Sequence, residues 1–141
     1  MENCVFCKIV SEKVPESLVY SDEKAIAFLD IRPVNPGHTL VIPRKHAVGL
    51  SDLDEETGAH VFKVAMRVAS ALRHSGVKCE GVNLLLSDGL AAFQEIFHVH
   101  LHVIPRFEGD NFRFSFGRGY AVKPGRTELD TVAAKIRAAM R

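Results

Sequence analysis

The sequence contains no apolar run long enough to cross a membrane and no excess of charge of either sign. Its 141 residues carry a formal net charge of +1, so no global basic field favours a nucleic-acid partner. There is also no internal repeat or low-complexity linker. With 47% hydrophobic and 25% charged residues, the chain has the composition of one globular domain spanning 1–141, with neither a nucleic-acid nor a membrane partner.

Cysteine is scarce, and nothing at the start of the chain resembles a signal peptide. Residues 1–4 lack the basic and apolar regions of such a peptide, so we expect a cytoplasmic protein. A reducing compartment argues against a disulfide framework for the three cysteines. Cys4 and Cys7 have the spacing of a zinc knuckle or a redox pair, although ordinary thiols in a flexible N-terminus would show the same spacing.

Alternating and apolar segments predict a sheet interrupted by one long helix. The helix begins near Ser51 and Asp54, which resemble a capping box, and ends near Gly76. A second helix is predicted over 127–140, capped by Thr127. Strands are predicted over 18–22, 25–31, 38–42, 81–87 and 97–104, with prolines ending the third and the last. Helix-length connections are too few for repeated βαβ units, so we expect an α+β fold with a mainly antiparallel sheet.

Three histidines, His98, His100 and His102, alternate with apolar residues in the last predicted strand. Alternate side chains of a strand share one face, so the imidazoles form a row opposite the apolar set. Residues two apart lie about 6.6 Å apart and residues four apart about 13 Å, so His98 and His102 are too distant to bind one metal ion. The row therefore favours divided roles over a single open metal site.

A row of imidazoles suits chemistry at phosphorus. One ring nitrogen can attack while the other is fixed by a hydrogen bond, and a neighbouring protonated histidine can stabilise charge on the phosphate oxygens. The ordinary alternative is a polar face on a half-buried strand. Three histidines on one face, in a chain that has only seven, favour the functional interpretation.

The histidine row and its neighbours resemble the histidine triad (HIT) family. The run His98–Ile104 matches the family motif of histidines alternating with hydrophobic residues, and segments 27–31 and 36–43 match in the family's order. The resemblance covers the chain from about Cys4 to Arg106 and leaves 107–141 as a C-terminal extension. It implies a five-stranded antiparallel sheet with a packed helix, usually in a homodimer.

The resemblance also implies a function. HIT proteins bind purine nucleotides, and many cleave nucleoside phosphoramidates or dinucleoside polyphosphates at the α-phosphate. By this resemblance His100 is the nucleophile that forms a nucleotidyl-histidine, His102 contacts the phosphate, and His38 supports the triad. The remaining nucleotide-binding positions implied by the family are Phe28, Asp30, Ile31, Asn83, Ser87, Gln94 and Glu95.

Three positions before the triad depart from the family pattern. Ser87 stands where an amide side chain often reaches the phosphate or ribose, and Phe93 replaces a glycine whose backbone can approach the phosphate. Glu95 replaces a hydroxyl residue tied to protonation of the leaving group, and its charge would repel a polyphosphate. These changes leave the size of the substrate and the identity of its leaving group undecided. They also motivate a second hypothesis, a nucleotide-binding regulatory dimer with little turnover.

In HIT relatives with an N-terminal Cys-x-x-Cys pair, zinc is held by the two cysteines, a later histidine and the first triad histidine. The corresponding residues here are Cys4, Cys7, His46 and His98. A closed site of this kind is structural and pins the N-terminus beside the triad. In the extension, the alternating aromatic and basic residues of 112–120 favour an edge or dimer contact over base stacking, because the charge elsewhere is balanced.

Overall fold

The computed structural model describes residues 2–141, which form two compact units separated after Asp110. The first unit contains the sheet, and Asn111–Arg141 form the second. None of the helices in this described part is long and apolar enough to cross a lipid bilayer.

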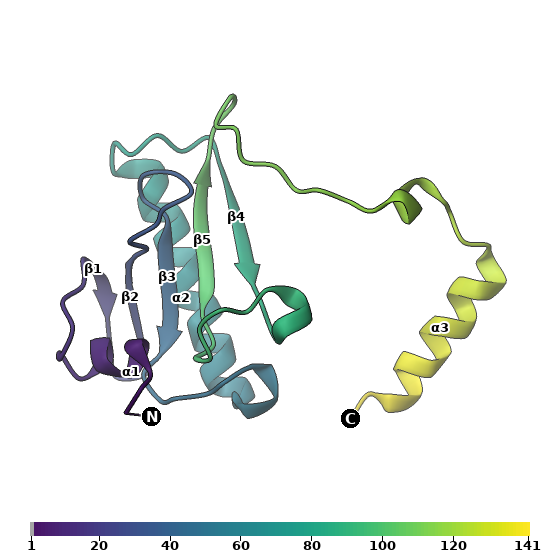
Figure 1. The fold of residues 1–141 in the computed structure, drawn as a ribbon, viewed down its shortest axis with the longest axis horizontal. Helices are drawn as coiled ribbons and strands as arrows, with labels where there is room; N and C mark the ends of the chain where they lie inside the picture. The colour runs from purple at the N-terminus through teal and green to yellow at the C-terminus, as the bar shows by residue number, and fades with distance from the viewer. Residues whose placement is uncertain (1) are drawn as a thin grey trace. The chain divides into compact units, whose positions relative to one another are not determined.

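A five-stranded sheet with the order β1-β2-β3-β5-β4 forms the centre of the first unit (Figure 1). Every neighbouring pair of strands is antiparallel, which confirms the expected α+β class. The strands are β1 (Leu18–Ser21), β2 (Ala25–Leu29), β3 (Thr39–Pro43), β4 (Gly81–Leu86) and β5 (Leu101–Arg106).

The long helix α2 (Glu55–His74) packs along one face of the sheet (Figure 1). Its N-cap is Asp54, whose carboxylate accepts a hydrogen bond from the Thr57 amide at 2.8 Å. The capping role predicted for Ser51 is wrong, because that residue lies in a separate 3₁₀ turn, η1 (Leu50–Asp52). Gly76 follows the helix with φ +83°, a left-handed conformation that glycine adopts without steric cost.

The alternation of the strands divides the buried side chains between two cores. Small and branched residues of β2, β3 and β5 face α2, including Ala27, Val41 and Val103. The intervening residues, such as Phe28, Leu40 and Ile42, form a second core on the opposite face. His102 pairs with Leu40 across β3 and β5, which places it on this second face.

A short N-terminal helix, α1 (Val5–Val10), covers the second face. Sequence patterning did not predict this helix, because its six residues are too few to show helical periodicity. Cys4 caps α1, since its Sγ accepts a hydrogen bond from the Cys7 amide at 3.3 Å. Phe6 and Ile9 are the buried residues of the helix and join the second core.

The predicted boundaries of the last strand are wrong at both ends. β5 begins at Leu101, so His98 and His100 lie on the segment that leads into the strand. That segment is held by the Val99 amide, which donates to the Ala47 carbonyl at 2.7 Å. Pro43 is the last residue of β3, as predicted, whereas Pro105 lies inside β5 and does not terminate it, since proline fits strand positions that need no ladder N–H.

The second unit contains a 3₁₀ turn, η3 (Arg118–Ala121), and the helix α3 (Arg126–Ala139). The N-cap of α3 is Gly125, so the cap predicted at Thr127 is wrong by two positions. The aromatic residues ahead of α3 pair with one another: Phe112 packs edge-on against Phe114, and Phe116 stacks on Tyr120.

Candidate active site and metal centre

Two of the three histidines of the row, His98 and His100, pack against α1, and His102 lies on β5. His98 is fully buried, His100 is 7% exposed, and His102 is half-buried. The ring of Phe6 packs edge-on against both His98 and His100, with centroids 5.9 and 5.2 Å away. Burial of this kind fixes each imidazole in one orientation, so the hydrogen bonds of its two nitrogens define what it can do.

His100 has its Nδ1 fixed by the backbone. The Nδ1–H donates to the carbonyl oxygen of His98 at 2.8 Å, which assigns the proton of the neutral ring to Nδ1. Nε2 therefore carries a free lone pair. An imidazole with one nitrogen tied to a carbonyl and the other unprotonated is arranged to act as a nucleophile.

His38 and His102 form a directed hydrogen-bond relay. The amide of Val34 donates to His38 Nδ1 at 3.0 Å, so the proton of neutral His38 lies on Nε2. That Nε2–H donates to His102 Nδ1 at 2.8 Å, which places the proton of His102 on its own Nε2. His102 thus presents an N–H donor, which can donate to an anionic oxygen, while the neighbouring His100 presents a lone pair.

Burial keeps the relay neutral. It lowers the pKa of His102 to about 4, and the adjacent His100 and His38 act in the same direction while Asp30 opposes them. Burial likewise lowers the pKa of His38, against the opposing charge of Asp30, whose carboxylate lies 3.6 Å from His38 Nε2. At neutral pH both histidines therefore act as hydrogen-bonding groups without a charge.

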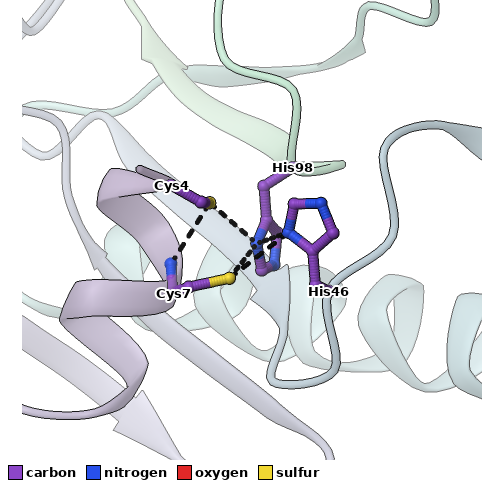
Figure 2. Close-up of side chains that lie close together, drawn as sticks. All are labelled: Cys4, Cys7, His46 and His98. Carbon is purple, nitrogen blue, oxygen red and sulfur yellow. Dashed lines mark hydrogen bonds between the residues drawn. The ribbon is translucent and has the colours of Figure 1, made fainter. Parts of the chain in front are cut away.

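Cys4, Cys7, His46 and His98 converge on one point, as Figure 2 shows. Their four ligand atoms all lie within 4.8 Å of one another. The two Nδ1 atoms are 3.3 Å apart, and three sulfur–nitrogen distances are 3.3, 3.5 and 3.6 Å. Tetrahedral zinc, with bonds of about 2.3 Å to sulfur and about 2.0 Å to nitrogen, separates two nitrogens by about 3.3 Å and a nitrogen from a sulfur by about 3.5 Å, so these residues fit such an ion.

The tautomer of His98 also fits a metal ligand. Its Nε2–H donates to the Pro43 carbonyl oxygen at 2.8 Å, so the nitrogen that faces the cysteines, Nδ1, is unprotonated. Burial lowers the pKa of His98, which keeps the ring in its neutral, ligating form. Burial and the neighbouring Cys4 raise the pKa of the Cys7 thiol in the absence of an ion, and a bound cation would reverse that effect.

Asp30, His38 and His102 form a second cluster with metal-ligating atoms close together, but their hydrogen bonds argue against an ion there. A metal at this point would need the lone pair of His38 Nε2. Protonation would then move to His38 Nδ1, against the Val34 amide that points at it. The cluster is therefore better described as the proton-ordered relay that orients His102.

The loop before the triad is organised by the buried amide of Gln94. Its Oε1 accepts from the Gly89 amide at 2.8 Å, and its Nε2 donates to the carbonyl oxygens of Val48 at 2.6 Å and Ile96 at 3.1 Å. The side chain predicted to bind nucleotide is thus occupied in holding the loop. Phe93, at the end of the 3₁₀ turn η2 (Leu90–Ala92), adopts φ +64° and leaves its ring 87% exposed.

The other predicted nucleotide-binding residues differ in burial and in the contacts that they make. Phe28 is buried against Phe6, and Ile31 is 94% exposed immediately after Asp30. Asn83 lies on β4, where its Oδ1 accepts a hydrogen bond from Arg106 at 2.6 Å, away from His100. Ser87, at the end of β4, is half-buried.

Two residues of the site were not predicted from the sequence. Phe6, between the two cysteines, packs on the histidine row, and only the unpredicted helix α1 places it there. Arg32 forms an ion pair with Glu95, with Nη2 and Oε2 3.3 Å apart. Nothing in the sequence connects these two residues, which are 63 positions apart.

Comparison with known proteins finds similarity over most of the chain. A model of the HIT domain matches residues 11–109. A HIT-like protein of Borreliella burgdorferi is 42% identical over 118 residues, which are 83% of this chain and 85% of that protein.

Two solved structures are similar over nearly the whole length of both chains. A zinc-bound histidine triad family protein from Mycobacterium smegmatis is 45% identical, covers 99% of each chain and superposes with a TM-score of 0.76. A histidine triad nucleotide-binding protein from Candida albicans is 26% identical, with coverage of 97% and 96% and a TM-score of 0.85.

The buried relay predicts an acid-sensitive fold. Because the pKa of His102 falls from 6.5 to about 4 on folding, its contribution to stability is complete above pH 6.5 and is lost as the pH falls toward 4. That difference corresponds to roughly 3 kcal/mol at most. We expect His102→Asn to flatten the dependence of Tm on pH between 6.5 and 4.5, measured by calorimetry. An unchanged slope, equal to that of the exposed-histidine control His74→Asn, would contradict the assignment.

The left-handed backbone of Phe93 predicts a gain in stability on substitution. Phe93→Gly relieves the steric cost of a positive φ and removes a ring that buries little surface. We expect its free energy of unfolding in urea to rise by about 1 kcal/mol. Ala92→Gly, one residue earlier in η2, is the control and should lower stability. Destabilisation by Phe93→Gly would show that the ring contributes to packing.

Proposed function

The chain belongs to the HIT family, and from this premise we propose that it is a nucleotide-binding hydrolase that cleaves at the α-phosphate of purine nucleotides. The observation that carries the proposal is the opposite polarity of two adjacent rings. His100 offers an unprotonated Nε2, and His102 offers an Nε2–H. Their centroids are 4.9 Å apart, so one phosphate group can meet both.

In the first step of the proposed reaction, the lone pair of His100 Nε2 forms a bond to the α-phosphorus. The bond from phosphorus to the leaving oxygen or nitrogen breaks, and the leaving atom keeps the electron pair. A leaving nitrogen gains a proton from an acid or from water, whereas a leaving phosphate oxygen departs as an anion. The carbonyl oxygen of His98 supports the positive charge that develops on the ring through Nδ1–H. His102 donates to a phosphate oxygen and stabilises the charge there.

In the second step a water molecule attacks the nucleotidyl-histidine. A phosphorus–oxygen bond forms, the phosphorus–nitrogen bond breaks, and its electron pair returns to His100 Nε2. The proton lost by the water passes to solvent, and the products are a nucleoside monophosphate and the neutral histidine. Asp30 and Ile31 border the relay and are proposed to line the ribose and base pocket, while Phe28 supports it from the core.

We also propose that the four-residue cluster binds a structural zinc ion. Cys4, Cys7, His46 and His98 would fill its coordination sphere, so it has no open position for catalysis. Its bonds would tie α1 to the segment that carries the triad. Because His98 is both a ligand and the residue whose carbonyl oxygen fixes His100, the ion would also stiffen the nucleophile's support.

A homodimer is the proposed assembly. β4 is an edge strand of the sheet, and its Leu84 and Leu85 are each more than a third exposed. On α2, Phe62 and Met66 are half-exposed, and Phe62 borders an apolar cavity of about 340 Å³ that also reaches Leu86. A second copy of the chain would cover this apolar surface and the open edge.

The catalytic proposal predicts loss of turnover in His100→Ala. Wild-type protein incubated with adenosine 5′-phosphoramidate or diadenosine tetraphosphate should release AMP, measured by chromatography, and the variant should be slower by about a thousandfold or more. His74→Ala on α2 is the control. Mass spectrometry of acid-sensitive adducts should find the adenylyl group on His100. Equal AMP release by wild type and His100→Ala would contradict the proposal, and tight AMP binding without turnover would favour a regulatory nucleotide-binding protein.

The metal proposal predicts one zinc ion per chain. Cys7→Ser should lose the zinc, measured by elemental analysis, and its Tm should fall by several degrees because the ion links segments far apart in the sequence. Cys79→Ser is the matched control and should keep the ion, since Cys79 lies outside the cluster. A Cys7→Ser protein with the wild-type zinc content would contradict this site.

A further inference from the structure

The ion pair between Arg32 and Glu95 joins the two loops that flank the histidine row. Arg32 lies two positions after Asp30, and its backbone amide donates to the Asp30 carboxylate at 2.8 Å. Glu95 lies three positions before His98, next to the buried Gln94 that anchors its loop. The pair therefore joins the segment that carries Asp30 to the segment that leads into the row.

Arg32 carries a permanent positive charge, and its backbone is linked to the row through Asp30 and His38. The relay histidines His38 and His102 are neutral, and Asp30 and Glu95 are acidic. A nucleotide would bring further negative charge to this surface. Without Arg32, the carboxylates would face the phosphates unopposed.

The pair is arranged so that an anion can replace Glu95. Both side chains are largely exposed, at 83% for Arg32 and 77% for Glu95. Exposed ion pairs of this kind contribute only about 0–1 kcal/mol, so little is lost when they separate. A phosphate chain offers a guanidinium a stronger, bidentate partner than one carboxylate oxygen.

We propose that Arg32 forms a subsite for the phosphate chain of an anionic leaving group, and that Glu95 is the counter-ion it releases when that chain binds. The proposal rests on the proposed function. When the phosphorus–oxygen bond breaks, the electron pair stays on the terminal oxygen of the departing polyphosphate, whose negative charge rises by one. The Arg32 guanidinium stabilises this added charge.

A phosphoramidate would gain nothing from the subsite. Its phosphorus–nitrogen bond breaks with the electron pair on nitrogen, which takes up protons and leaves as neutral ammonia. Arg32 therefore favours substrates with an anionic leaving group over those with a neutral one, and Glu95 reduces that preference by competing for the guanidinium. Glu95 therefore lowers the affinity of the subsite for a polyphosphate. While the ion pair is intact, the charge of Arg32 offsets the repulsion between Glu95 and the polyphosphate.

The test compares two substrates that share the adenylyl group, diadenosine tetraphosphate and adenosine 5′-phosphoramidate. For Arg32→Ala we expect kcat/KM to fall about tenfold on the tetraphosphate and to change less than about twofold on the phosphoramidate. Arg32→Lys should recover part of the loss, because an ammonium group keeps the charge and lacks the bidentate contact. Glu95→Gln should raise kcat/KM on the tetraphosphate by about threefold, because the competitor for Arg32 is gone.

Opposite effects of Arg32→Ala and Glu95→Gln on the tetraphosphate distinguish this subsite from a simple strap between loops. A strap would make both substitutions lower kcat/KM alike on both substrates, and that result would overturn the proposal. Arg126→Ala, at an exposed arginine of α3, is the control. If wild type releases AMP from neither substrate, the proposed function itself fails; if it cleaves both and Arg32→Ala affects them equally, only the subsite fails.

Discussion

The site depends on hydrogen bonds that assign one proton to one nitrogen of each imidazole. His98 gives its Nε2–H to the Pro43 carbonyl, so an unprotonated Nδ1 faces the cysteines. His100 gives its Nδ1–H to the His98 carbonyl, so Nε2 is free. His102 accepts at Nδ1 from His38, so its Nε2 is a donor. Three chemically identical side chains thereby present different nitrogens as donor and acceptor, because a neutral imidazole has only one proton to place.

The two cores of the sheet explain how these hydrogen bonds are kept free of water. One core packs against α2 and supplies most of the apolar burial, while the other packs against the much shorter α1 and carries the histidines. Six helical residues cannot hold their own conformation in water. A metal ion at Cys4 and Cys7 would supply the missing stability, and the same ion would bind His98 at the base of the row. The proposed metal centre and the histidine row are thus parts of one structural unit.

Much of the site could be predicted from the sequence because its residues are close together in the chain. The spacing of His98, His100 and His102 indicated separate roles, and resemblance to the HIT family placed Cys4 and Cys7 in one cluster with distant His46, a grouping that the structure brings together. The sheet could be predicted from alternation, except at Pro105, where strand pairing overrides the local signal.

What could not be predicted depends on tertiary contacts. The helix α1 is too short to show periodicity, so Phe6 could not be assigned to the site. The ion pair of Arg32 and Glu95 joins loops 63 residues apart, so no pattern in the sequence indicates that the two residues meet. Gln94 matched a nucleotide-binding position by resemblance, but only the structure shows its amide bonded to the backbone of its own loop and of Val48.

The central claim is that each histidine of the row is protonated at a defined ring nitrogen, and ¹⁵N NMR of the histidine side chains tests it most directly. At pH 7, long-range proton–nitrogen correlations in the zinc-loaded protein should show His100 protonated at Nδ1 and unprotonated at Nε2, with the reverse pattern for His102. A proton on Nε2 of His100 would contradict the account, because that nitrogen would then have no lone pair for phosphorus.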